Sequence, residues 1–128
     1  MSHVAEFKTQ FRSVEALEKA LVNLGWEIRY DGKINTYPSD PKRNVVYEKY
    51  AANPTKGGYD IGLVESKEGE INIIYDPYGG SVEKSLGSGL SELKKNYVLK
   101  LMEEEFETVE ILETLADGSI VVEGDDGL

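Results

Sequence analysis

The sequence predicts an α+β domain, with one antiparallel sheet of about six to seven strands and two helices packed on one face of it. Three observations lead to this class. Apolar residues recur every three or four positions in two segments, as in amphipathic helices. In most other segments they alternate with polar residues or form short β-branched runs, as in strands. Short turns join several of these strands, which therefore pair antiparallel, and both helices need a sheet face to cover their apolar stripes.

The first helix is predicted between Ser13 and Gly25, after a strand that ends at Lys8 to Arg12. Ser13 is a suitable N-cap, because its hydroxyl can accept a hydrogen bond from a backbone N–H of the first turn. Gly25 ends the helix, as expected of a residue that tolerates a positive φ. The residues that form one apolar stripe along this helix are Val14, Leu17, Leu21 and Leu24.

The middle of the chain is predicted to be mostly strand. A polar loop with glycine and prolines covers residues 31–43. Glu68 and Gly69 form a turn, so the two strands beside them are expected to make a hairpin. The strands predicted here from β-branched, aromatic and alternating apolar residues are 26–30, 44–50, 59–64 and 71–75.

A glycine- and serine-rich loop is predicted at residues 76–89, followed by a second amphipathic helix from Leu90 to about Glu105. A hairpin then joins strands 109–115 and 119–123 across Asp117 and Gly118, a pair that favours a type I′ turn. The domain organisation that follows is one globular domain over residues 1–123 and an acidic frayed tail over residues 124–128.

Composition excludes several classes of function. The chain has 128 residues, enough for one domain with its own core, and it has no cysteine for disulfides, thiolate metal sites or a cysteine nucleophile. Its net charge of −10 opposes binding to duplex nucleic acid. No apolar run approaches the roughly 20 residues that span a bilayer, and no signal peptide is visible. We therefore expect a cytoplasmic protein without a membrane partner.

Several short motifs recur in a known family in the same order. They are Met1-Ser2-His3, Lys8-Thr9, Ala20-Leu21, Leu24-Gly25, Tyr59-Asp60-Ile61-Gly62 and Asp117-Gly118-Ser119. With them the chain resembles the family of hypothetical chloroplast reading frame thirty-five, a domain of unknown function in plastids, cyanobacteria, bacteria and phages. The resemblance spans nearly the whole chain and implies the fold but no activity. It departs at residues 76–80, where family members often have tryptophans.

The sequence contains no arrangement typical of an enzyme. The single histidine, His3, lies near the N-terminus, and no metalloprotease, phosphate-loop or nucleophile-elbow motif is present. The acidic residues lack the ligand spacing of an EF-hand loop. We therefore expect no catalytic residues, no metal and no cofactor.

The best candidate for a binding site is the glycine-rich loop together with a basic pair upstream. Glycines let backbone N–H groups approach an anion, and the start of the following helix adds partial positive charge. Lys42 and Arg43, on the long polar loop, are expected to close over the same ligand from a neighbouring subunit. The loop candidates are Tyr75, Tyr78, Gly79, Gly80, Ser81, Lys84 and Ser88. The alternative is that both segments are ordinary solvated connectors.

Two functions from different classes follow. In the first, the protein is a non-catalytic binder of a small phosphorylated molecule, such as a signalling nucleotide that it sequesters, with a pocket built by a homo-oligomer. In the second, it is an acidic interaction module that docks onto a larger protein partner, such as an ATPase, through its sheet face or its C-terminal hairpin. A structural subunit without a ligand is the third alternative.

Overall fold

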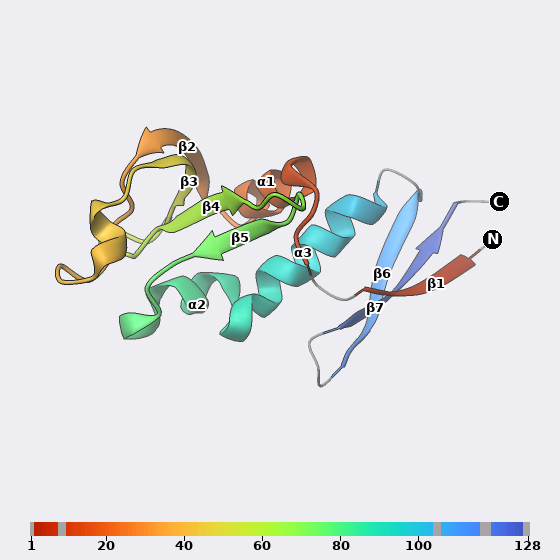
Figure 1. Ribbon diagram of the computed structural model, residues 1–128. Coiled ribbons are helices and arrows are strands. Elements are labelled where there is room, and N and C mark those ends of the chain that lie inside the picture. Colours follow the sequence, from red (N-terminus) through yellow and green to blue (C-terminus); the bar gives the residue numbers. More distant parts are fainter. Residues whose placement is uncertain (1, 8–9, 104–105, 116–118, 127–128) are drawn as a thin grey trace.

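The computed structural model describes residues 2–7, 10–103, 106–115 and 119–126 (Figure 1). The strands are β1 (Ser2–Phe7), β2 (Glu27–Gly32), β3 (Tyr47–Ala52), β4 (Ile61–Glu65), β5 (Ile71–Ile74), β6 (Thr108–Thr114) and β7 (Ile120–Asp125). The α-helices are α1 (Val14–Asn23), α2 (Ser81–Leu86) and α3 (Ser91–Met102). Strands β2 to β5 begin and end within three residues of the predicted bounds.

The α+β class is confirmed, but the strands form two sheets rather than one. The four-stranded sheet has the order β2-β3-β4-β5 and the three-stranded sheet the order β1-β7-β6, with every pairing antiparallel. Helix α3 lies between them, because it packs on α1 and also contacts β6 and β7 (Figure 1). The prediction of a single continuous sheet is therefore wrong. Turn lengths show which strands pair locally, but not that a helix interrupts the sheet.

The capping of α1 is confirmed. Ser13 Oγ accepts a hydrogen bond from the N–H of Ala16 at 3.1 Å. Gly25 has a φ of +90°, and its N–H and that of Trp26 donate back to carbonyls of the last helical turn at 3.0 Å. This is the Schellman arrangement, which glycine adopts without the steric cost of a Cβ. Trp26 is consequently turned inward and is buried.

The predicted strand up to Arg12 is wrong over its last residues, because residues 10–12 form no strand and residues 8–9 lie outside the described part of the chain. Phe11 is instead buried, with its ring 5.0 Å from that of Tyr97 in an edge-to-face contact. Tyr97 Oη accepts the N–H groups of Arg12 and Ser13, both at 3.0 Å. Because Phe11 packs against Tyr97 in the core, the chain turns away from β1 at this point and enters α1.

The predicted loop at residues 76–89 contains a helix, α2. Val82 and Leu86 are four positions apart and both are buried, so one face of α2 belongs to the core. Ser85 Oγ on the same helix accepts a hydrogen bond from Trp26 Nε1 at 2.8 Å. Because glycine and serine content alone favours a loop, the short apolar stripe of Val82 and Leu86 was not predicted.

The C-terminal hairpin is confirmed as the antiparallel pair β6–β7, while its predicted turn lies outside the described residues. Strand β7 continues to Asp125, beyond the predicted end at Glu123. Gly124 is buried and pairs with Val109, and a Cβ there would meet the ring of Phe106 at 2.5 Å. The expected frayed tail is therefore part of the sheet up to Asp125, because a close aromatic contact holds the strand.

The core lies between the helices and the four-stranded sheet and extends to β7. Its members include small and large apolar side chains from almost every element. The least exposed of them are Ala20, Leu21, Ala51, Ile61, Leu86, Leu93 and Val122. None of the described helices is long and apolar enough to cross a membrane, and the longest, α3, has 12 residues.

Candidate functional site

Two of the nine predicted ligand-binding residues line one cavity. Lys42 and Tyr78 belong to a cavity of about 310 Å³, here called the Tyr37–Tyr78 cavity. Its other lining residues are Tyr37, Ser39, Asp40, Pro41 and Asp76. The long polar loop and the segment after β5 therefore meet within one chain. Lys42 thus already lies near this segment in its own chain, whereas the sequence suggested an approach from a neighbouring subunit, which stays a prediction.

Asp76 builds this cavity. Its side chain is only 7% exposed, and its two carboxylate oxygens accept the N–H groups of Tyr37 at 3.1 Å and of Tyr78 at 2.9 Å. The hydrogen bond from the Tyr78 N–H closes a local Asx-type turn. The hydrogen bond from the Tyr37 N–H joins Asp76 to a loop that lies 39 positions earlier in the chain. Both tyrosine rings are thereby brought together, with centroids 4.8 Å apart in an edge-to-face arrangement. Tyr37 is nevertheless 44% exposed and Tyr78 63% exposed.

The charges of the cavity differ from those expected of a phosphate site. Asp40 Oδ2 lies 3.3 Å from Lys42 Nζ, and Asp40 Oδ1 accepts the backbone N–H of Lys42 at 2.9 Å. That backbone hydrogen bond is the main reason why the pKa of Asp40 lies below its usual value. A phosphate would thus meet two carboxylates, those of Asp40 and Asp76, and one lysine that is already paired.

Arg43, the other predicted cation, has a structural contact. Its Nη1 donates to the backbone carbonyl of Thr36 at 2.8 Å, and Thr36 itself is buried. The guanidinium therefore ties two parts of the long loop together. Asp60 fixes the same loop from the other side, because its Oδ2 accepts the N–H of Asn35 at 2.7 Å.

The remaining predicted residues follow β5 but do not converge on one point. Gly79 and Gly80 adopt φ values of +75° and +71° in a short 3₁₀ turn (Tyr78–Gly80), and no atom lies near where their Cβ atoms would be. Ser81 Oγ accepts the N–H of Tyr59 at 3.0 Å. Lys84 and Ser88 are exposed. Helix α2 has six residues, too few for a strong dipole at its N-terminus.

Tyr75 is partly buried and packs against the core. Burial, and secondarily the nearby Glu83 carboxylate, raises the pKa of Tyr75. Burial likewise raises the pKa of Tyr59, with Asp76 as the next cause. These two tyrosines therefore stay neutral at ordinary pH and act as part of the packing around α2.

A strong segregation of charge along the chain was missed by the motif-based reasoning. Residues 101–128 contain ten of the 24 acidic residues and none of the 14 lysines and arginines. Residues 1–100 accordingly hold 14 acidic and 14 basic residues and are formally neutral. The whole net charge of −10 thus lies in the segment that forms β6 and β7. Counting charges along the sequence would have revealed it.

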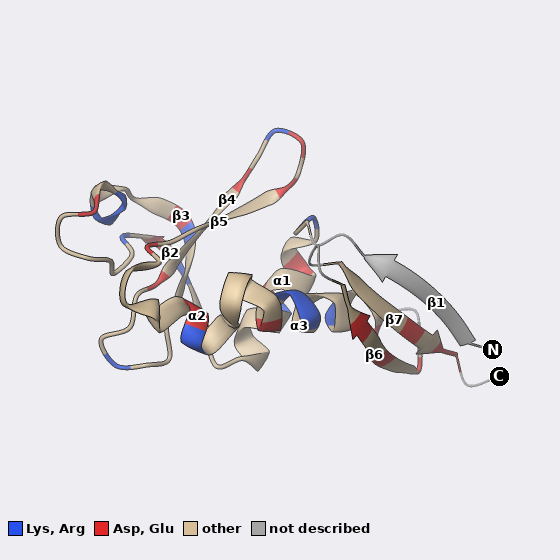
Figure 2. Cartoon of the chain, turned by 90° about the horizontal axis from the view of Figure 1, so that it is seen from below, with Lys and Arg blue, Asp and Glu red and all other residues tan. Residues whose placement is uncertain are grey.

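The fold places three of these ten acidic residues on one face of the three-stranded sheet. Along β7, buried residues alternate with half-buried ones, so Val121, Glu123 and Asp125 point away from the core. Glu110 on β6 is the direct cross-strand partner of Glu123, and Glu113 is that of Val121. We call this surface, formed by Glu110, Glu113 and Glu123, the acidic face. Figure 2 shows acidic and no basic positions on β6 and β7.

Among the described residues, no group of three or more histidine, cysteine or carboxylate side chains could hold a metal ion. No known protein family, curated protein or solved structure matches this chain. The resemblance to the family of hypothetical chloroplast reading frame thirty-five therefore stays a prediction.

Proposed function

We propose that the protein is a non-catalytic interaction module that docks onto a basic surface of a protein partner through its acidic face. The observation that carries the proposal is the cross-strand pair Glu110–Glu123. Like charges directly opposite each other weaken a sheet by a few tenths of a kcal/mol to about 1 kcal/mol. In the described part of the chain, neither glutamate has a cationic partner that offsets this repulsion.

A lysine or arginine of a partner, set between Glu110 and Glu123, would turn this repulsion into two attractions. The same charges repel a second copy of this chain, so the face favours a different, basic partner over self-association through β6 and β7. Attraction of this kind mainly accelerates encounter and selects the partner, and it weakens as salt rises. The proposed module therefore binds strongly at low salt and measurably less at 0.3 M salt.

The test compares two triple variants of equal net charge. The first is Glu110→Gln, Glu113→Gln, Glu123→Gln, which neutralises the acidic face. The matched control is Glu27→Gln, Glu68→Gln, Glu92→Gln, which removes three exposed carboxylates from the neutral part of the chain. The probe is a fluorescent peptide of alternating lysine and alanine, and binding is followed by anisotropy at several salt concentrations.

We expect the first variant to weaken binding by about tenfold, because three attractions of about 0.5 kcal/mol each are lost. The control is expected to change it less than about twofold. Equal losses in both variants would mean that the peptide responds to net charge alone, and the proposed docking face would then be rejected.

A small phosphorylated ligand is the second candidate, and one observation favours it: Lys42 and Tyr78 line the same cavity. In this candidate Tyr78 stacks on a base and Lys42 leaves Asp40 for the phosphate. A melting-temperature screen against mono-, di- and cyclic nucleotides tests it. A ligand at 100 times its dissociation constant adds about 2.7 kcal/mol to the free energy of unfolding. We expect any such shift to vanish in Lys42→Ala, and a flat screen would remove this candidate.

A further inference from the structure

We propose a second binding site, for a small amphipathic cation, in the cleft between α1 and the four-stranded sheet. The expected ligand is a compact apolar group that carries an ammonium. This site lies in the neutral part of the chain and does not depend on the acidic face. Each proposal can therefore fail without the other.

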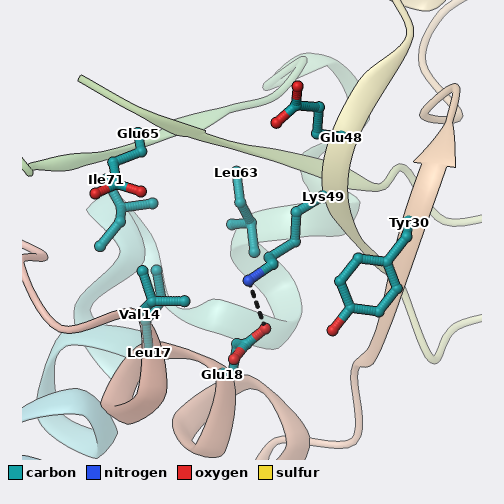
Figure 3. Close-up of a pocket in the computed structure, with 9 residues that line it drawn as sticks. All are labelled: Val14, Leu17, Glu18, Tyr30, Glu48, Lys49, Leu63, Glu65 and Ile71. Carbon is teal, nitrogen blue, oxygen red and sulfur yellow. Dashed lines mark ion pairs between the residues drawn. The ribbon is translucent and has the colours of Figure 1, made fainter. Parts of the chain in front are cut away.

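The cleft has apolar walls. It encloses about 280 Å³, close to the lower end of the size range of small-molecule pockets. Val14 and Leu17 line it from α1, and Leu63 and Ile71 line it from β4 and β5 (Figure 3). The side chains of Leu17, Leu63 and Ile71 are almost fully buried, so the floor of the cleft is continuous with the core. A compact apolar group that entered would leave water for an apolar surface.

Lys49 closes one side of the cleft. Its Nζ points down from β3 toward α1 and lies 3.0 Å from Glu18 Oε1, as the dashed line in Figure 3 marks. The same Nζ lies 5.7 Å from the centre of the Tyr30 ring, within the range of a cation–π contact. The side chains of Lys49 and Glu18 are only 29% and 26% exposed. The one lysine that lines the cleft is therefore already neutralised.

Two further carboxylates line the cleft. Glu48 and Glu65 are both exposed, and within the described part of the chain neither has an ion-pair partner. Glu65 lies beside Ile71, to which it is paired across β4 and β5, and away from Lys49 (Figure 3). The lining thus carries three carboxylates and one lysine. This balance attracts an ammonium and repels an anion, while the apolar walls select for an attached hydrocarbon group.

The test uses three probes of one shape and different charge: 2-phenylethylamine, 2-phenylethanol and 3-phenylpropionate. Binding is followed by the NMR shifts of the methyl groups of Val14, Leu63 and Ile71. We expect saturable shifts with the amine in the millimolar range and binding at least about tenfold weaker for the carboxylate. Equal binding of all three probes would overturn the assignment to a cation, and no saturable shift of these methyl groups would overturn the site.

Two variants locate the charge that the ligand meets. Glu65→Gln is expected to weaken binding of the amine by about twofold to fivefold, as for a partly exposed ion pair, and to leave 2-phenylethanol unchanged. Glu107→Gln removes an exposed carboxylate that lies before β6, away from both proposed binding surfaces, and is expected to change neither. An identical loss in both variants would show attraction to net charge rather than to the cleft, and it would reject the proposal.

Discussion

The two sheets of this protein treat charged side chains differently. Around the four-stranded sheet, several carboxylates lie next to cations, as in the pairs Glu18–Lys49, Glu27–Arg29 and Asp40–Lys42. Glu48 and Glu65, which have no ion pair within the described part of the chain, line the cleft beside Lys49. On the three-stranded sheet, Glu110 lies opposite Glu123, with no cation in its own segment. Charge in the first region contributes to local structure, whereas charge in the second opposes it. From this difference we infer that the second region carries charge for something outside the chain.

Packing, in contrast, joins the two regions. Helix α3 supplies buried residues to both, and Leu93 and Val98 are almost wholly inaccessible. Core residues Ile120 and Val122 of β7 belong to the same apolar cluster as Leu17 and Leu21 of α1. The two regions therefore share one continuous core although their surfaces differ in charge. Variants can test the shared core and the charge of each region separately.

The largest effect is expected for Leu93→Ala, which tests whether the two regions unfold together. Leu93 is fully buried, so the change should lower the free energy of unfolding by about 2–5 kcal/mol. Urea unfolding followed by the fluorescence of Trp26, the single tryptophan, reports on the first region. Hydrogen exchange of the β7 amides reports on the second. If only the Trp26 transition moved, the core would not couple the sheets.

Gly124→Ala should destabilise the three-stranded sheet. An added Cβ would lie 2.5 Å from ring atoms of Phe106, and such overpacking costs about 1–3 kcal/mol. The denaturation midpoint in urea measures the loss. Phe106→Ala in the Gly124→Ala background should cost less than Phe106→Ala alone, because the clash is gone. Simple additivity of the two changes would contradict the contact.

Glu110→Gln is expected to stabilise the protein, in contrast to most substitutions. Removing one member of the Glu110–Glu123 pair relieves a repulsion of about 0.2–1 kcal/mol, so the melting temperature should rise by a few degrees or less. The gain should shrink as salt is added. Glu27→Gln, which breaks a pair with Arg29, serves as the control and should give no gain. Stabilisation by both variants would contradict the inference that charge opposes folding in one region and supports it in the other.

The smallest effect concerns Asp40, a paired carboxylate. Its pKa in the folded protein is lowered, chiefly by the backbone N–H of Lys42, so its charged form is favoured by folding. The contribution is therefore present above the unfolded value of about 3.9 and disappears as the pH falls through the lower folded pKa. Asp40→Asn should melt earlier than the parent at pH 7, and this difference should close as the pH falls through the lowered folded pKa of Asp40. A difference that is independent of pH would contradict the assignment.

Local features were predictable from the sequence, and contacts between distant segments were not. Ser13 and Gly25 mark α1 because capping depends on residues a few positions apart. The turn at Gly69, with a φ of +80°, gave the β4–β5 hairpin for the same reason. The pairing of β1 with β7 has no such local signature, and without it a single sheet was the simpler arrangement.

In the candidate sites, too, local features were predictable and contacts between distant segments were not. Asp76 joins Tyr37 to Tyr78 through a buried carboxylate, a bond between segments 39 positions apart that no motif announces. Glycine content drew attention to Gly79 and Gly80, although the chain uses them to turn into α2. The acidic segment after Lys100 could have been predicted, since it requires only a count of charges in order.

The pairing of β1 with β7 also sets the order in which the molecule can assemble. Ser2 lies opposite Asp125, so the two ends of the described chain are side by side (Figure 1). During synthesis β1 leaves the ribosome before β7, and the strand it pairs with emerges after more than a hundred further residues. The segment from α1 to α3 can meanwhile form its helices and the four-stranded sheet. Closing so long a loop slows folding, and β1 waits as an unpaired strand until β7 arrives.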